Sequence, residues 1–166
     1  MNLSFKNFSI RIIGYLPYII FFYVIYTIEI FRELLLYNVL LQLMLFLIVA
    51  CIPAYLTKRM SYVDIAWPWG LVLIGALVLL LGDGYKPRIF LISGMYLFSG
   101  LRMGIGALIL LKKGHLDTEL SRYTYQRRRW KKAGYKNLDI SLQYEIMIQC
   151  FANITFLALP AFLMAQ

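Results

Sequence analysis

The sequence predicts an all-α protein, a polytopic bundle of about five membrane-spanning helices. Three observations support this: 61% of the 166 residues are hydrophobic, the mean hydropathy is +0.71, and apolar residues run continuously rather than alternating with polar ones. Lipid offers the backbone no hydrogen-bond partner, so such a chain crosses a membrane as helices or as a closed barrel, and unalternating runs favour helices. We expect one membrane domain over residues 1–166.

Apolar segments long enough to cross the hydrocarbon, which takes about 20 helical residues, follow one another along the chain. They cover residues 12–28, 34–56, 62–81, 89–111 and 142–165. The polar run from Gly82 to Pro87 predicts a tight turn between the third and fourth segments. The first segment is too long for the core of a secretory signal and lacks a small-residue cleavage site, so we expect it to remain as an anchor.

The basic loop, residues 112–136, is the one long polar stretch and separates the last two segments. It carries nine of the 17 Lys and Arg residues, together with the single histidine. With the N-terminus in the cytoplasm, thirteen Lys and Arg residues lie on that side and three, Arg32, Lys86 and Arg88, lie on the other. We therefore expect an integral multi-pass protein whose N-terminus and basic loop are cytoplasmic and whose C-terminus is not.

Arg102 lies inside the fourth segment, ten residues before Lys112, so a regular helix places it about 15 Å below the cytoplasmic end. A charge at that depth costs about 2.5 to 3.5 kcal/mol on insertion scales unless it faces water or an acid. A functional site is the working hypothesis, with snorkelling or helix pairing as the alternative. Gly100 and Gly104 make a GxxxG spacing, which predicts close packing against another helix.

Asp64 and Trp67 stand three residues apart at the start of the third segment, so they share a helix face. Pro68 has no N–H, which leaves the carbonyl of Asp64 without its usual helical donor and able to accept from a ligand. These groups would converge near the cytoplasmic face. A helix-starting aspartate in an interfacial tryptophan belt explains the same spacing, and both interpretations stay open.

The basic loop also admits two interpretations. Topology accounts for much of its charge, and the run from Arg127 to Lys132 would attract anionic lipid head groups. Topology does not require the other functional side chains interleaved with these charges, namely His115, Asp117, Glu119, Arg122, Tyr123 and Tyr125. Such a mixture can hold a phosphate-bearing ligand. Arginine guanidiniums would bind the phosphate through two parallel hydrogen bonds, and carboxylates would accept hydrogen bonds from ribose hydroxyls or amine groups.

Other chemistries find no support in the sequence. Cys51 and Cys150 lie in apolar runs and predict packing residues, and one histidine cannot build a His-rich metal site, so we expect no metal. Motifs of the GxSxG, HExxH, CxxC and Walker types are absent. A loop held at the membrane between two spanning helices is badly placed to contact bases in a nucleic-acid groove. We therefore expect no nucleic-acid partner.

Several of these stretches resemble the steroid 5-alpha-reductase-like superfamily, and in particular its bacterial domain-of-unknown-function branch. They are Tyr62 to Trp67, Leu101 to Gly104, Glu119 to Tyr123 and Arg127 to Trp130, and their order and separation also match. The chain departs from the family at Leu120, where an aspartate is usual. It also lacks the later Arg-His-Pro-Asn-Tyr-like cofactor motif, so it resembles the N-terminal part only.

The resemblance implies an enzyme that uses NADPH to reduce a carbon–carbon double bond conjugated to a carbonyl in a hydrophobic, steroid-like or isoprenoid-like lipid. It implies that basic residues hold the cofactor's phosphates and that a protein acid polarises the substrate carbonyl. The residues so implied are Asp64, Glu119 and Tyr123 for catalysis and Arg102, Arg122, His115 and Trp67 for cofactor binding.

The missing motif leaves alternatives. The chain is a fragment or truncated product, or it works with a partner chain that supplies the C-terminal half. A function from another class is a non-catalytic membrane module whose basic loop binds anionic lipid or a partner subunit. An isoprenylcysteine-methyltransferase-like enzyme, which shares the helical architecture and uses a methyl donor, is a further possibility.

Overall fold

The computed structural model describes residues 3–135 and 137–166, and all regular structure in that part of the chain is helical. The elements are α1 (Leu3–Thr27), α2 (Glu29–Phe46), the π-helical η1 (Leu47–Cys51), α3 (Ile52–Thr57), α4 (Val63–Leu81), α5 (Lys86–Lys112), α6 (Ser121–Lys132), α7 (Leu138–Ile154) and α8 (Ala158–Met164). Within these ranges, 5 helical segments are long and apolar enough to cross a membrane. The predicted class and number of spans are confirmed.

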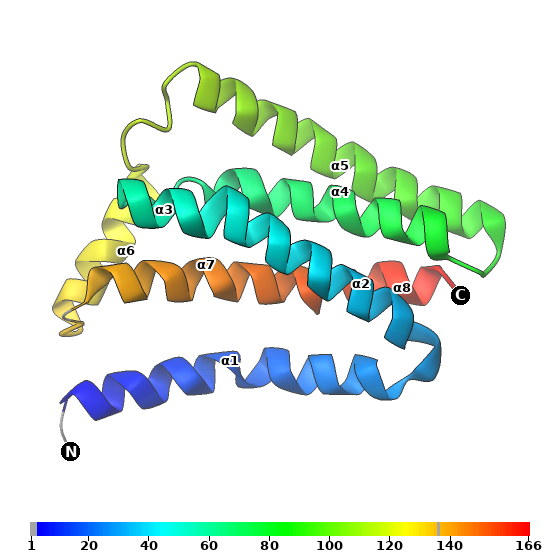
Figure 1. The fold of residues 1–166 in the computed structure, drawn as a ribbon, viewed down its shortest axis with the longest axis horizontal. Coiled ribbons are helices and arrows are strands. Elements are labelled where there is room, and N and C mark those ends of the chain that lie inside the picture. The colour runs from blue at the N-terminus through cyan, green and yellow to red at the C-terminus, as the bar shows by residue number, and fades with distance from the viewer. Residues whose placement is uncertain (1–2, 136) are drawn as a thin grey trace.

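The long helices lie side by side, and α6 lies across one end of the bundle (Figure 1). That end, which also holds the turn between α3 and α4 and the loop between α5 and α6, is called the basic end below. The opposite end holds the α4–α5 turn and the end of α8, where the Gly84 backbone N–H donates to the Ala165 carbonyl over 2.8 Å. The start of α1 and the end of α8 thus lie at opposite ends of the bundle (Figure 1).

Helix α4 is the centre of the bundle and shares its largest interface with α5. The glycines of the GxxxG spacing form this interface, because a Cβ at Gly100 would come within 2.8 Å of the Pro68 carbonyl oxygen. A Cβ at Gly104 would come within 2.9 Å of Trp69 Nε1. The predicted packing role of both glycines is confirmed.

Three fully buried amides, Asn38, Gln42 and Asn153, tie α2, α4 and α7 together in the core. Gln42 Nε2 donates to the Gly70 carbonyl over 2.9 Å, and Asn153 Nδ2 donates to the Trp67 carbonyl over 3.2 Å. Gln42 Nε2 also donates to Asn38 Oδ1 over 3.2 Å. Buried amides are costly in apolar surroundings unless they are hydrogen-bonded, so this network specifies how the three helices are rotated against one another.

Some boundaries differ from those expected. The fifth apolar run begins earlier, at Leu138, because the side chain of Asn137 caps α7 by accepting from the Ile140 N–H over 3.0 Å. The same run is interrupted between α7 and α8. The basic loop contains the 12-residue helix α6, and its last residue, Lys136, lies outside the described residues.

A π-helical segment, Leu47–Cys51, lies just before Pro53, which is in the first turn of α3. Proline removes one backbone donor and crowds the preceding turn, and a wider turn relieves that clash. Cys51 lies in this segment and is buried with a free thiol, as is Cys150. Both are packing residues, as their sequence context predicts.

Candidate functional site

A pocket of about 470 Å³ lies at the basic end between α4, α5, α6 and α7 and is called the α4–α6 pocket below. Its lining consists of Val63, Asp64, Trp67, Pro68, Met103, Arg122, Tyr123 and Gln149. Four residues singled out from the sequence, Asp64, Trp67, Arg122 and Tyr123, therefore line one pocket. They come from two stretches that lie almost sixty residues apart in the chain.

Asp64 is the centre of the polar contacts in this pocket. The Tyr123 hydroxyl donates to Asp64 Oδ1 over 2.5 Å, and the Arg122 guanidinium forms an ion pair with Asp64 Oδ2. The guanidinium carbon of Arg122 also lies 4.8 Å from the centroid of the Tyr123 ring. The Asp64 side chain is 24% exposed, whereas that of Arg122 is 61% exposed. The three side chains form one unit that joins the first turns of α4 and α6.

Burial raises the pKa of Tyr123 well above the ordinary tyrosine value, and its hydrogen bond to Asp64 and the charge of that carboxylate raise it further. Arg122 opposes this increase only in part. A phenolate beside Asp64 would place two negative charges together, so the hydroxyl keeps its proton near neutral pH. Tyr123 is therefore a hydrogen-bond donor in this pocket rather than a base.

The local sequence explains why these side chains meet. Asp64 lies in the first turn of α4, where the free N–H groups of a helix favour a carboxylate. Trp67 follows one turn later on the same face, as the spacing predicted. Side-chain amides are bonded to the carbonyls of Trp67 and Gly70. The prediction that a ligand uses the freed carbonyl of Asp64 stays a prediction.

Glu119 lies outside this pocket and joins the α5–α6 loop to the α3–α4 turn. Its Oε1 accepts from the Met60 N–H over 3.0 Å and from Ser61 Oγ over 3.2 Å. Its Oε2 accepts from Arg127 Nε over 3.0 Å and from Arg127 Nη2 over 2.7 Å. The Glu119 and Arg127 side chains are 15% and 21% exposed. These four residues, called the Glu119 clamp below, hold the loop in place.

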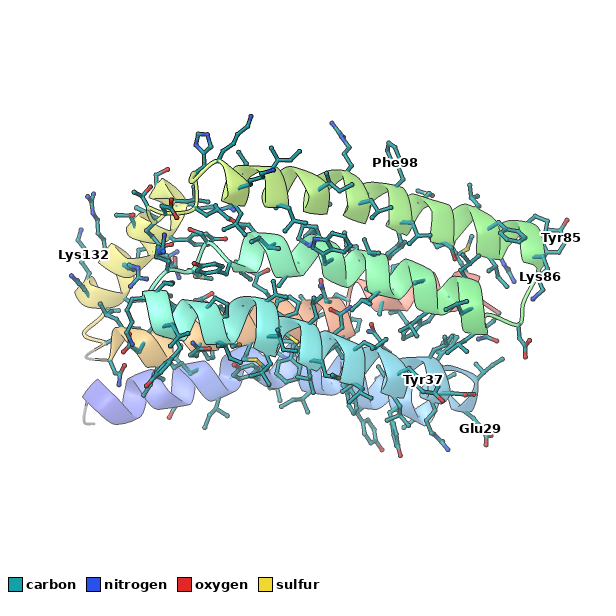
Figure 2. All side chains as sticks on the ribbon, turned by 45° about the horizontal axis from the view of Figure 1, so that its top comes forward. Glu29, Tyr37, Tyr85, Lys86, Phe98 and Lys132 are labelled. Atoms are coloured by element: carbon teal, nitrogen blue, oxygen red, sulfur yellow. The ribbon has the colours of Figure 1, made fainter. Side chains whose placement is uncertain are left out.

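Arg102 and His115 do not line the α4–α6 pocket. Phe98, one turn before Arg102, points away from the bundle (Figure 2), and Arg102 is exposed on the same outward face of α5. Within the described part of the chain Arg102 has no hydrogen bond or ion pair. His115 is exposed in the loop, where its backbone N–H donates to the Leu110 carbonyl over 3.0 Å. The structure does not bring either residue to the other four.

Sequence reasoning missed two lining residues, Met103 and Gln149. Gln149 had a usable signal, because Glu145, Gln149 and Asn153 recur at intervals of four in an apolar run and so define a polar helix face. A single methionine in an apolar helix carries no such signal. Among the described residues, no three His, Cys, Asp or Glu side chains are grouped so that they could hold a metal ion.

Comparison with known proteins finds one family model, described as a protein of unknown function (DUF1295), which matches residues 45–166. The matched range contains all residues of the α4–α6 pocket and all residues of the Glu119 clamp. No curated protein and no solved structure matches the chain.

Proposed function

The chain belongs to the DUF1295 family, and from that premise we propose that it acts as a membrane reductase of the steroid 5-alpha-reductase-like type. The proposed reaction is reduction of a carbon–carbon double bond conjugated to a carbonyl in a steroid-like or isoprenoid-like lipid. The observation that supports it best is the hydrogen-bonded unit of Asp64, Arg122 and Tyr123 in a pocket lined by membrane-spanning helices.

Reduction of a conjugated double bond builds negative charge on the carbonyl oxygen, so the site needs a donor aimed at that atom. Tyr123 keeps its proton because burial and Asp64 raise its pKa. Its hydroxyl can turn from Asp64 towards a carbonyl oxygen in the pocket, while the neighbouring Arg122 guanidinium adds positive charge. Asp64 holds both side chains in place through its contacts with the Tyr123 hydroxyl and the Arg122 guanidinium.

The lining fits the nicotinamide end of NADPH. The indole of Trp67 can stack against the flat nicotinamide ring, and the side-chain amide of Gln149 can form hydrogen bonds with the nicotinamide carboxamide. Arg122 is the one cation among the described lining residues, and its place in the first turn of α6 adds backbone N–H groups that favour phosphate. When bound there, the cofactor would supply the hydride.

Access for substrate and cofactor follows from the position of the pocket. It lies at the basic end, where the apolar helices meet the polar segment, so a lipid can enter from the membrane and a dinucleotide from the aqueous side. We propose that this side is the cytoplasm, because the sequence has thirteen Lys and Arg residues in the segments assigned to it and three in those assigned to the other side. One-sided labelling of a Lys132→Cys variant in sealed vesicles measures the orientation.

A partner chain remains part of the proposal. Arg102 is exposed on α5 and makes no polar contact within the described residues. A partner helix seated against this face would supply the acid or cavity that a charge at this depth requires. Co-purification of a second membrane protein with the wild-type chain, and its loss with Arg102→Leu, is the expected result.

The test of the reductase proposal is protection by NADPH against thermal unfolding of the purified chain in lipid nanodiscs. We expect millimolar NADPH to raise the Tm by about 2 °C or more. The Arg122→Gln variant should lose this rise, whereas Arg128→Gln, an exposed neighbour outside the pocket lining, should keep it. Absence of any rise in the wild-type chain would overturn the proposal.

A second candidate function, binding of anionic lipid by a non-catalytic module, is favoured by the exposed cations of α6. Arg128, Lys131 and Lys132 are exposed and have no ion pair in the described part of the chain, and Lys132 projects away from the bundle (Figure 2). Each such cation near a membrane contributes about 1 kcal/mol to attraction of anionic lipid. Enrichment of phosphatidylglycerol around the protein, without any protection by NADPH, is the result that would support this function.

A further inference from the structure

A second pocket, of about 320 Å³, lies further along α6, between α1, α6 and α7. It is called the α1–α7 pocket below. It shares no lining residue with the α4–α6 pocket, and the proposed reaction makes no use of it. Its walls carry charged side chains of both signs, which come from three different helices.

The charged groups of the α1–α7 pocket are two guanidiniums and one carboxylate. Arg11 comes from α1, Arg129 from α6 and Glu145 from α7. Gln126 connects two of them, because its Nε2 donates to Glu145 Oε1 over 3.2 Å and its Oε1 accepts from Arg129 Nη1 over 3.4 Å. The lining therefore presents positive and negative charge close together, with a net charge of one positive unit from these three side chains.

Arg11 is held in place by neighbours on the α7 side of the pocket. Its guanidinium carbon lies 4.4 Å from the ring centroid of Tyr135 and 5.5 Å from that of Tyr144, and its Nη2 donates to Ser141 Oγ. A Cβ at Gly14 would collide with the Tyr144 hydroxyl, so α1 and α7 touch directly below the pocket. A guanidinium fixed in this way is preorganised, and its remaining N–H groups stay available to an anion.

The depth of the pocket matches the zone where lipid head groups meet hydrocarbon. The first apolar span begins at Ser9 and the last at Leu138, so Arg11 lies in the first turn of its span and Glu145 about two turns into its own. Trp130 and the tyrosines of the lining are residue types that favour this interface. Ile10, also in the lining, is exposed on α1 and provides an apolar surface for the first part of an acyl chain.

We infer that the α1–α7 pocket binds the head group of a membrane phospholipid that carries a phosphodiester and a primary ammonium, as phosphatidylethanolamine does. The phosphodiester lies between Arg11 and Arg129, and the ammonium donates to Glu145. A purely anionic head group would set its charge against Glu145 as well as against the arginines. A quaternary ammonium cannot donate a hydrogen bond to the carboxylate, so the primary ammonium is preferred.

The test uses the full chain, purified in detergent and examined by native mass spectrometry with added phosphatidylethanolamine, phosphatidylcholine or phosphatidylglycerol of identical acyl chains. We expect phosphatidylethanolamine to be retained in preference to the other two. Arg129→Gln should lower this retention by about tenfold, as expected for loss of one charge-assisted contact to phosphate. Arg128→Gln is the matched control, since Arg128 is adjacent and exposed but does not line the pocket.

Glu145→Gln tests the ammonium contact, because the amide keeps an acceptor for Gln126 and loses the charge. This variant should retain phosphatidylethanolamine and phosphatidylcholine equally, with unchanged thermal unfolding. Equal retention of all three lipids by the wild-type chain would overturn the inference, and so would equal losses for Arg128→Gln and Arg129→Gln. Displacement of the lipid by millimolar inorganic phosphate would also overturn it, because the site would then recognise phosphate alone. Protection by NADPH in Arg129→Gln reports on the reductase proposal separately.

Discussion

Two arginine–carboxylate pairs lie at the basic end of the bundle, and they differ in what surrounds them. The Glu119–Arg127 pair is nearly enclosed, and backbone, hydroxyl and guanidinium donors occupy both carboxylate oxygens. The Asp64–Arg122 pair lines a pocket, and its arginine is mostly exposed. The first pair therefore stabilises a loop, while the second keeps donors available for a ligand.

The comparison shows that residue type and charge do not distinguish a clamp from a binding site. Asp64 at the start of α4 pairs directly with Arg122 of α6, and Glu119 of the other pair accepts from Met60 in the turn before α4. What separates them is the number of protein donors that each carboxylate already accepts and the space beside the arginine. The predictions below test this difference, from the largest expected effect to the smallest.

Glu119→Ala should cause the largest loss of stability, about 3 kcal/mol in the free energy of unfolding, because it leaves the nearly buried Arg127 and the Met60 N–H without their acceptor. Chemical unfolding in detergent micelles measures it. Asp117→Ala is the control. That side chain is 76% exposed and lies 3.6 Å from Arg59, so its loss should change stability by about 0.5 kcal/mol or less. Equal effects of the two variants would show that Glu119 is not a clamp.

Gly70→Ala should have the next largest effect, a loss of about 2 kcal/mol, because a new methyl group has no room beside the buried amides. Its Cβ would come within 2.6 Å of Gln42 Oε1 and would collide with Asn153 Nδ2. Gly106→Ala is the matched control in a helix, since a Cβ there meets nothing within 4 Å. The Tm values of the two variants, measured in parallel, test whether the network of Asn38, Gln42 and Asn153 is as rigid as its hydrogen bonds imply.

Arg122→Gln and Arg127→Gln should rank in opposite orders in two measurements. Arg127→Gln should lower the free energy of unfolding by about 2 kcal/mol, since it uncouples a nearly buried carboxylate. Arg122→Gln should lower it by about 0.5 kcal/mol, because solvent screens this exposed arginine. Protection by NADPH should follow the reverse order, with Arg122→Gln losing more. The same order in both measurements would remove the distinction between the two pairs.

Tyr123→Phe should have the smallest effect, the loss of one hydrogen bond to Asp64, and this effect should depend on pH. The pKa of Tyr123 is raised in the folded protein, so its contribution to stability is fully present below the ordinary tyrosine pKa of about 10. This contribution is lost as the pH rises through the higher folded value. The wild-type chain should therefore lose more stability above pH 10 than Tyr123→Phe. Tyr125→Phe, an exposed neighbour, should behave as the wild-type chain does.

Local pattern accounts for much of the site as well as the fold. The spacing of Asp64 and Trp67 correctly placed them on one helix face, and the mixed composition after Thr118 pointed to Arg122 and Tyr123. The contribution of Gln149 required knowledge of which face of α7 turns towards α4. Arg102 shows the same difficulty, since its neighbour Met103 lines the pocket and Arg102 does not. Consecutive helical residues point about 100° apart, so a small rotation of α5 decides between them.

The sequence by itself determined that this is a helical membrane protein, where its spans lie, and which glycines let two of them pack closely, because hydrophobic run length and short-range spacing are local properties of the chain. Only the tertiary structure decided which carboxylate lines a pocket and which one holds a loop. Asp64 meets Tyr123, and Glu119 meets Met60, across almost sixty residues of chain. Such contacts depend on the rotation and depth of every helix in between, and no local pattern encodes these.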